Sequence, residues 1–216
     1  MSVDLGRPVV VLVEGQTDER LLASLLAHLQ VSERVCVTQG RNASGKGAIN
    51  TPLLKSVVAE YTLHERPLDA LGIVADSDAD ANETFRHYRA VFANAGLTPP
   101  TAAGMVASGP PRTGVLAVPP GGPGEPEDIL WDYYRDRVPD LASCIDNARE
   151  AVEAVDPPAR VKRSKILVHS AWVYGINRAP TVRPLRAPHQ TFDQAFWDWS
   201  HPAFSPLSQF VADLLG

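Results

Sequence analysis

Three short apolar segments, each followed by a segment with the apolar spacing of a helix, constrain the fold of this chain most strongly. The apolar segments are RPVVVLVE (residues 7–14), RVCVTQ (34–39) and LDALGIVAD (68–76). The helix-like segments that follow them span residues 17–29, 48–63 and 82–96. Strands and helices that alternate at short intervals are typical of a parallel sheet covered by helices. We therefore expect an α/β chain with a mainly parallel sheet flanked by helices.

Proline and glycine interrupt the second half of the chain. Its predicted elements are strands at residues 105–107 and 113–118 and helices at 126–138, 141–154, 163–176 and 206–215. We interpret residues 1–156 as the core and residues 157–216 as a basic, Pro-rich C-terminal extension, helical and irregular, that packs on the core within one structural domain. Trp197 and Trp199 are expected to pack this segment against the core rather than to stack on bases.

Charge is distributed unevenly along an acidic chain. A formal net charge of −5 argues against a protein that coats nucleic acid without selection. Between Asp156 and Asp193, however, there is no acidic residue. The basic residues of that segment are Arg160, Lys162, Arg163, Lys165, Arg178, Arg183 and Arg186. The segment is either a solvated tail or a strip that contacts phosphate, and in the second interpretation Arg163 binds the phosphate backbone.

Neither the N-terminal apolar run nor the cysteines indicate export. Residues 9–13 form an apolar run of five residues, too short for a signal peptide core or a membrane span. We therefore expect a cytoplasmic protein with no membrane partner. Cys36 lies in a predicted strand and Cys144 in a predicted helix, without metal-ligand or redox spacing. Both are expected to be reduced thiols in the core.

The segment GRNASGKG, residues 40–47, is close to a phosphate-binding P-loop. Such a loop requires a Ser or Thr after its Lys to hold Mg²⁺, and here Gly47 follows Lys46. The segment also follows the second predicted strand, whereas a P-loop usually follows the first. A nucleotide site built on Lys46 is therefore the weakest hypothesis. We expect a Gly-rich loop at the same edge of the sheet as the carboxylates described next, where Arg41 and Lys46 contact phosphate.

Carboxylates follow two of the predicted strands. Glu14 ends the first strand and Asp18 lies four residues further on, whereas Asp76 and Asp78 end the third strand. If these strands are neighbours, the carboxylates converge at the edge of the sheet where parallel strands build their sites. Like charges so close together need a cation or bound protons. Oxygen ligands without His or Cys favour Mg²⁺, then Mn²⁺ or Ca²⁺.

These acidic segments also resemble other motifs in part. DSDAD fails as an EF-hand loop because Ala81 replaces the required Gly and His87 stands in place of the bidentate Glu. A haloacid-dehalogenase nucleophile would follow the first strand rather than the third. Asp80 is a candidate helix N-cap, and Asp18 alone is better explained as a first-turn acid that compensates the helix dipole.

VEGQTD and IVADSD together resemble the Toprim domain, in which one strand ends in Glu-Gly and a later strand ends in Asp-x-Asp. Within that superfamily, over roughly residues 7–130, the chain is most similar to stand-alone, uncharacterised prokaryotic Toprim-like proteins related to OLD-type nucleases. The resemblance implies a Rossmann-like fold and Mg²⁺, with Mn²⁺ as a substitute. It implies that Glu14 and Lys165 act in catalysis. The metal ligands that it implies are Glu14, Asp18, Asp76, Asp78 and Glu127, with Asp128 or Glu125 as additional candidates.

The expected function is a Mg²⁺-dependent nuclease or a related phosphodiester-transfer enzyme that acts on DNA or RNA. The alternative is a Toprim-like module that binds nucleic acid or a separate ATPase without catalysis, because no OLD-type ATPase is present on this chain. The sequence is compatible with an enzyme and with a non-catalytic module, and also with a homodimer. The expected partners are nucleic acid and a separate ATPase.

Overall fold

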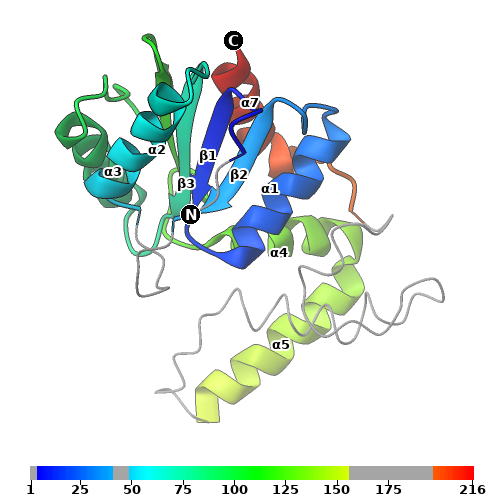
Figure 1. The fold of residues 1–216 in the computed structure, drawn as a ribbon. Coiled ribbons are helices and arrows are strands. Elements are labelled where there is room, and N and C mark those ends of the chain that lie inside the picture. The colour runs from blue at the N-terminus through cyan, green and yellow to red at the C-terminus, as the bar shows by residue number, and fades with distance from the viewer. Residues whose placement is uncertain (1–3, 41–48, 156–196) are drawn as a thin grey trace.

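The computed structural model describes residues 4–40, 49–155 and 197–216, and it forms one layered α/β unit (Figure 1). The strands are β1 (Val9–Val13), β2 (Val35–Gln39), β3 (Ala70–Asp76), β4 (Val106–Ala107) and β5 (Arg112–Val118). The helices are α1 (Gln16–His28), α2 (Thr51–Leu63), α3 (Ala81–Asn94), α4 (Pro126–Arg137), α5 (Pro139–Val155), the 3₁₀ helix η3 (Pro202–Phe204) and α7 (Ser205–Leu215).

The strands form one sheet in the order β2-β1-β3-β5-β4. All neighbours are parallel except β4, which pairs antiparallel with β5 at the edge of the sheet. The α/β fold with a mainly parallel sheet is therefore confirmed. The predicted neighbourhood of the first and third strands is also confirmed, because Val13 of β1 pairs with Val74 of β3.

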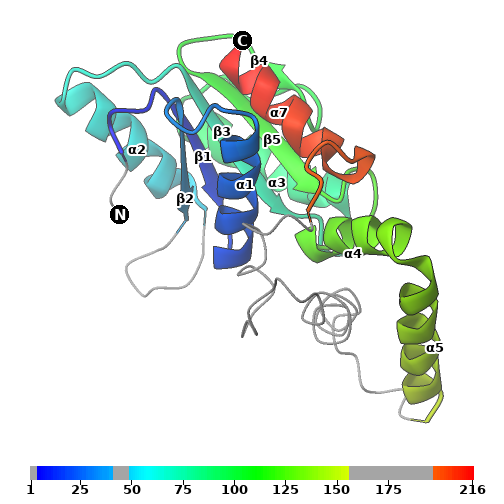
Figure 2. The ribbon, with the colours of Figure 1, turned by 90° about the vertical axis from the view of Figure 1, so that its right-hand side faces the viewer.

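Side chains alternate between two buried layers on opposite faces of the sheet. Val10 and Leu12 pack with α2 and α3, whereas Val9, Val11 and Val13 pack with α1, α4 and α7. Figures 1 and 2 show these helices on the two faces, with α5 projecting away from the sheet beyond α4. A strand covered on both faces is apolar at every position, which explains the uninterrupted run VVVLV in the sequence.

Both ends of α3 follow from local sequence, and its N-cap is the predicted Asp80. The Asp80 side chain caps its start by accepting a hydrogen bond from the Asn82 N–H at 2.8 Å. Gly96, just beyond its end, has a φ of +82°, the left-handed conformation expected of a glycine that terminates a helix.

The C-terminal helix α7 packs on a pair of glycines in the middle of the sheet. Gly72 of β3 and Gly114 of β5 are direct neighbours in the register. A Cβ atom at Gly72 would lie 2.6 Å from Leu214 Cδ1, and one at Gly114 would lie 2.7 Å from Phe210 Cε2. The missing side chains let α7 approach the sheet closely. Trp197 is likewise buried against Tyr133, as expected for the segment that leads to α7.

We expect Gly114→Val to lower the free energy of unfolding by about 2 kcal/mol, because its methyl groups would enter space that the Phe210 ring occupies. Urea unfolding measures this change. The matched control is Gly122→Val, since a Cβ atom at Gly122 would meet nothing within 4 Å. An equal loss in the two variants would contradict the close packing of α7.

One expectation about a cysteine differs from the structure, and several other expectations fall on residues that the structure does not describe. Cys36 is buried as predicted, but the prediction of a core position for Cys144 was wrong. Cys144 lies in α5 on the face opposite the buried Ala142 and Ile145, so its thiol meets solvent. The basic residues Arg41, Lys46, Arg163 and Lys165, and the predicted helix at 163–176, lie outside the described residues.

In the described part of the chain, no helix has the length and apolar character needed to span a membrane.

Candidate metal site

The candidate site lies at the carboxyl ends of β1, β3 and β5. Glu14 directly follows β1, and Asp76 is the last residue of β3. Asp76 pairs in the register with Val118, the last residue of β5, so the segment after β5 leaves the sheet beside it. That segment leads to α4. Three chain segments therefore meet at one edge of the sheet, and each carries acidic residues.

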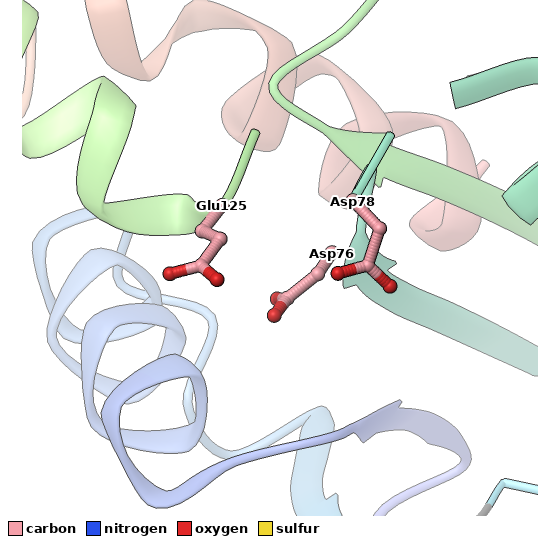
Figure 3. Close-up of side chains that lie close together, drawn as sticks. All are labelled: Asp76, Asp78 and Glu125. Carbon is pink, nitrogen blue, oxygen red and sulfur yellow. The ribbon is translucent and has the colours of Figure 1, made fainter. Parts of the chain in front are cut away.

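Three of these acids are close enough to share one cation. Asp76, Asp78 and Glu125 each offer a carboxylate oxygen, and the three oxygens lie within 4.8 Å of one another. Figure 3 shows the three carboxylates turned toward a common space between the end of β3 and the start of α4. Glu125 is 5% exposed, Asp76 is half-buried and Asp78 is exposed, so the group opens to solvent on one side. The cluster can therefore hold a metal ion supplied from solution.

Hydrogen bonds between the two loops bring this group together. The Asp78 N–H donates to the Gly124 carbonyl at 2.9 Å, and the Gly124 N–H donates back to the Asp78 carbonyl at 2.8 Å. Ser77, which is fully buried, donates from its N–H to the Val118 carbonyl and from its hydroxyl to the Pro119 carbonyl, both at 2.8 Å. The loop after β3 is thus tied to the segment that precedes Glu125.

Both residues of this bridge have unusual backbone conformations. Asp78 has a φ of +47°, which lies in the left-handed region that residues other than glycine adopt uncommonly. Gly124 has a φ of +144°, and a Cβ atom there would lie 2.9 Å from Pro119 Cδ and closer still to the carboxylate of Asp128. Only glycine fits this position. A non-glycine residue held at positive φ is often found at a functional site, where surrounding contacts maintain the strain.

Two acids outside the group of three hold the starts of helices. The Asp128 carboxylate accepts a hydrogen bond from the Glu125 N–H at 2.8 Å at the start of α4. In α1, the Asp18 carboxylate accepts one from the Gly15 N–H at 2.9 Å. Asp18 is only 8% exposed. This hydrogen bond supports the expectation that Asp18 stabilises the first turn of its helix.

Electrostatic repulsion couples the carboxylates. The pKa of Asp76 is raised to about 7, first by burial and then by the charges of Asp18, Glu14, Glu127 and Asp78. A carboxylate in this setting is costly to ionise without a compensating cation. The same coupling places Glu127, in the first turn of α4, within electrostatic reach of Asp76.

Glu14 is not a member of the group of three. Its Oε1 accepts a hydrogen bond of 2.5 Å from the hydroxyl of Tyr88, which lies in α3. Burial is the main cause that raises the pKa of Glu14; the Tyr88 hydrogen bond opposes this effect, and the charges of Asp78 and Asp18 add to it. Glu14 and Tyr88 line a cavity of about 320 Å³ together with Asp76, Asp78 and His87.

The five metal ligands that the Toprim resemblance implies all belong to the residues that the structure describes, and all lie at this edge of the sheet. Asp76 and Asp78 belong to the group of three, whereas Glu14, Asp18 and Glu127 surround it and act on Asp76 through their charges. The third member is Glu125, which the sequence marked only as an additional candidate beside Asp128. The sequence feature that points to Glu125 is its place directly before Pro126, the proline that begins α4.

The family model described as "Protein of unknown function (DUF3226)" matches residues 8–216, nearly the whole chain. No curated protein and no solved structure matches this chain. The family match therefore spans the sheet, the three-carboxylate group and the C-terminal helix.

Proposed function

We propose that this chain, which belongs to the DUF3226 family, is a metal-dependent nuclease or a related phosphodiester-transfer enzyme that acts on DNA or RNA. The observation that carries the proposal is the group formed by Asp76, Asp78 and Glu125, whose oxygens converge within 4.8 Å beside a cavity. The resemblance to the Toprim domain remains part of the proposal. In its support, the Glu of one strand end and the Asp-x-Asp of the other lie on neighbouring strands.

The donor atoms fit Mg²⁺, with Mn²⁺ as a substitute. The group offers carboxylate oxygens alone, and hard divalent ions prefer such ligands over softer metals. The raised pKa of Asp76 adds to this fit, because a bound cation would offset the burial and the repulsion that disfavour its ionised form. When bound, such an ion supplies positive charge for phosphate oxygens and for the leaving oxygen.

The residues around the group of three have separate tasks in this proposal. Asp76, Asp78 and Glu125 hold the ion. Glu14, which lies beside the cavity and outside the group of three, takes the proton of the attacking water or hydroxyl. Burial raises the pKa of Glu14, which makes its carboxylate a better proton acceptor than an exposed one. Nucleic acid is the proposed partner, and the basic residues from Arg160 to Arg186 are the proposed contacts to its backbone.

The test is incubation of the purified protein with supercoiled DNA, single-stranded DNA and RNA in Mg²⁺ or Mn²⁺. We expect at least one substrate to be cleaved, and cleavage to stop in EDTA. Mn²⁺ affinity is measured in parallel by calorimetry. Binding of Mn²⁺ without cleavage of any substrate would contradict the nuclease proposal and favour a binding module that partners a separate ATPase. Absence of Mn²⁺ binding would contradict the metal site itself.

A further inference from the structure

Tyr88 connects the middle of α3 to the candidate site. Its hydroxyl donates to Glu14 Oε1 at 2.5 Å, across 74 positions of sequence. The side chain is only 6% exposed, so the hydroxyl reaches Glu14 from within the protein. The contact therefore joins a buried donor to a carboxylate at the tip of β1.

The ring of Tyr88 is a rigid anchor for that hydroxyl. It belongs to the buried layer formed by α2, α3 and the sheet, together with Val91 and Phe92 of the same helix. His87 packs edge-on against it, with 4.8 Å between the ring centroids. A side chain packed on several sides cannot change rotamer without disturbing its neighbours. The position of the hydroxyl is thus set by the core and not by solvent.

This anchor determines where Glu14 lies. Glu14, Asp76 and Asp78 all line the cavity, but Glu14 is not a member of the group of three whose oxygens converge. A Glu side chain has three rotatable bonds, and a charge-assisted hydrogen bond to one oxygen restricts all of them. Without the hydroxyl, the Glu14 carboxylate would be free to sample other rotamers at the cavity.

We propose that Tyr88 is a positioning residue, whose hydroxyl holds the Glu14 carboxylate beside the cavity and apart from Asp76, Asp78 and Glu125. The consequence for catalysis rests on the proposed function, in which Glu14 accepts a proton. A proton acceptor must keep a fixed distance from the atom it serves, and a displacement of about 1 Å can cost about 100-fold in rate.

The first experiment needs neither metal nor substrate. In metal-free protein with ¹³C-labelled Glu side chains, the carboxyl resonance of Glu14 is assigned by its loss in Glu14→Gln. We expect this resonance to move in Tyr88→Phe, which keeps the ring but removes the donor. The matched control is Tyr61→Phe. Among the described residues, the buried Tyr61 hydroxyl binds backbone carbonyls alone, those of Arg7 and Asp4, at 2.5 and 3.2 Å. A resonance that stays in place in Tyr88→Phe would overturn the proposal.

The second experiment measures the effect on cleavage. We expect Tyr88→Phe to lower kcat by about 10- to 100-fold. KM and the Mn²⁺ affinity should change less than about threefold, because the Tyr88 hydroxyl donates to Glu14 and not to a carboxylate of the group of three. In a Glu14→Gln background the same substitution should have no further effect on kcat. A loss of kcat that persists in that background, or that Tyr61→Phe reproduces, would overturn the positioning role. If the wild type cleaves nothing, the proposed function fails, and the Glu14 resonance still decides whether Tyr88 holds Glu14.

Discussion

Asp76→Asn is expected to weaken Mn²⁺ binding by at least about 100-fold and cleavage by about 1000-fold, yet to make the metal-free protein more stable. The variant loses a charged oxygen of the group of three while keeping the size of the side chain. It also removes the charge that burial and four neighbouring carboxylates disfavour. Opposite effects on binding and on stability are the signature of a site that is built for a cation at the expense of the fold.

The gain in stability depends on pH in a defined direction. Asp76 has a pKa of about 7 in the folded protein, above its ordinary value of 3.8. Well below pH 3.8 it is protonated in both the folded and unfolded states, so its charge has no effect. As the pH rises toward 7 the unfolded chain loses the proton more readily, and the folded state is progressively disfavoured. Asn does not titrate. Asp76→Asn should therefore exceed the wild type in stability by about 1–2 kcal/mol at pH 8, after allowance for solvent screening, and by less at pH 5.

Urea unfolding in EDTA at pH 5 and pH 8 measures this difference, and calorimetry with Mn²⁺ measures the loss of binding. Asp213→Asn is the matched control, because Asp213 is an exposed residue of α7 whose carboxylate accepts a hydrogen bond from Gln209. It should bind Mn²⁺ as the wild type does. Unchanged Mn²⁺ affinity in Asp76→Asn, or lower stability of that variant at pH 8, would contradict the site.

Phe210→Ala is expected to lower the free energy of unfolding by about 4 kcal/mol, which is a large part of the stability of a domain this size. The Phe210 side chain is 1% exposed and lies directly over Gly72 and Gly114 in the middle of the sheet. The glycines have no side chains to fill the vacated space, so the cavity would remain. The C-terminal helix therefore stabilises the fold by covering β3 and β5 on one face of the sheet.

Chemical unfolding of Phe210→Ala, followed by circular dichroism, measures the loss. The control is Leu63→Ala at the end of α2, where the side chain is 75% exposed and its removal should cost less than about 0.5 kcal/mol. A loss below about 1 kcal/mol for Phe210→Ala would mean that α7 is not part of the core that stabilises the sheet.

Much of the site was predictable because strand ends are local signals. An apolar run that ends in an acid marks the end of a buried strand, and parallel strands bring their carboxyl ends to one edge of the sheet. Asp76 and Asp78 could be named on that basis. Between Glu125, Glu127 and Asp128, however, the choice depends on how α4 begins. That start is set by the hydrogen bonds between Asp78 and Gly124 and by the Asp128 cap, and the first of these joins segments far apart in the chain.

Short-range patterns of apolar residues, caps and turns were enough to predict the α/β fold, the edge of the sheet that carries the acids, and the start of α3. Long-range packing was needed to show which acids converge, that Tyr88 donates a hydrogen bond to Glu14, that Cys144 faces solvent, and that α7 lies over two glycines. Each of these depends on contacts between residues that are distant in the chain, whose distances are set when the helices pack on the sheet.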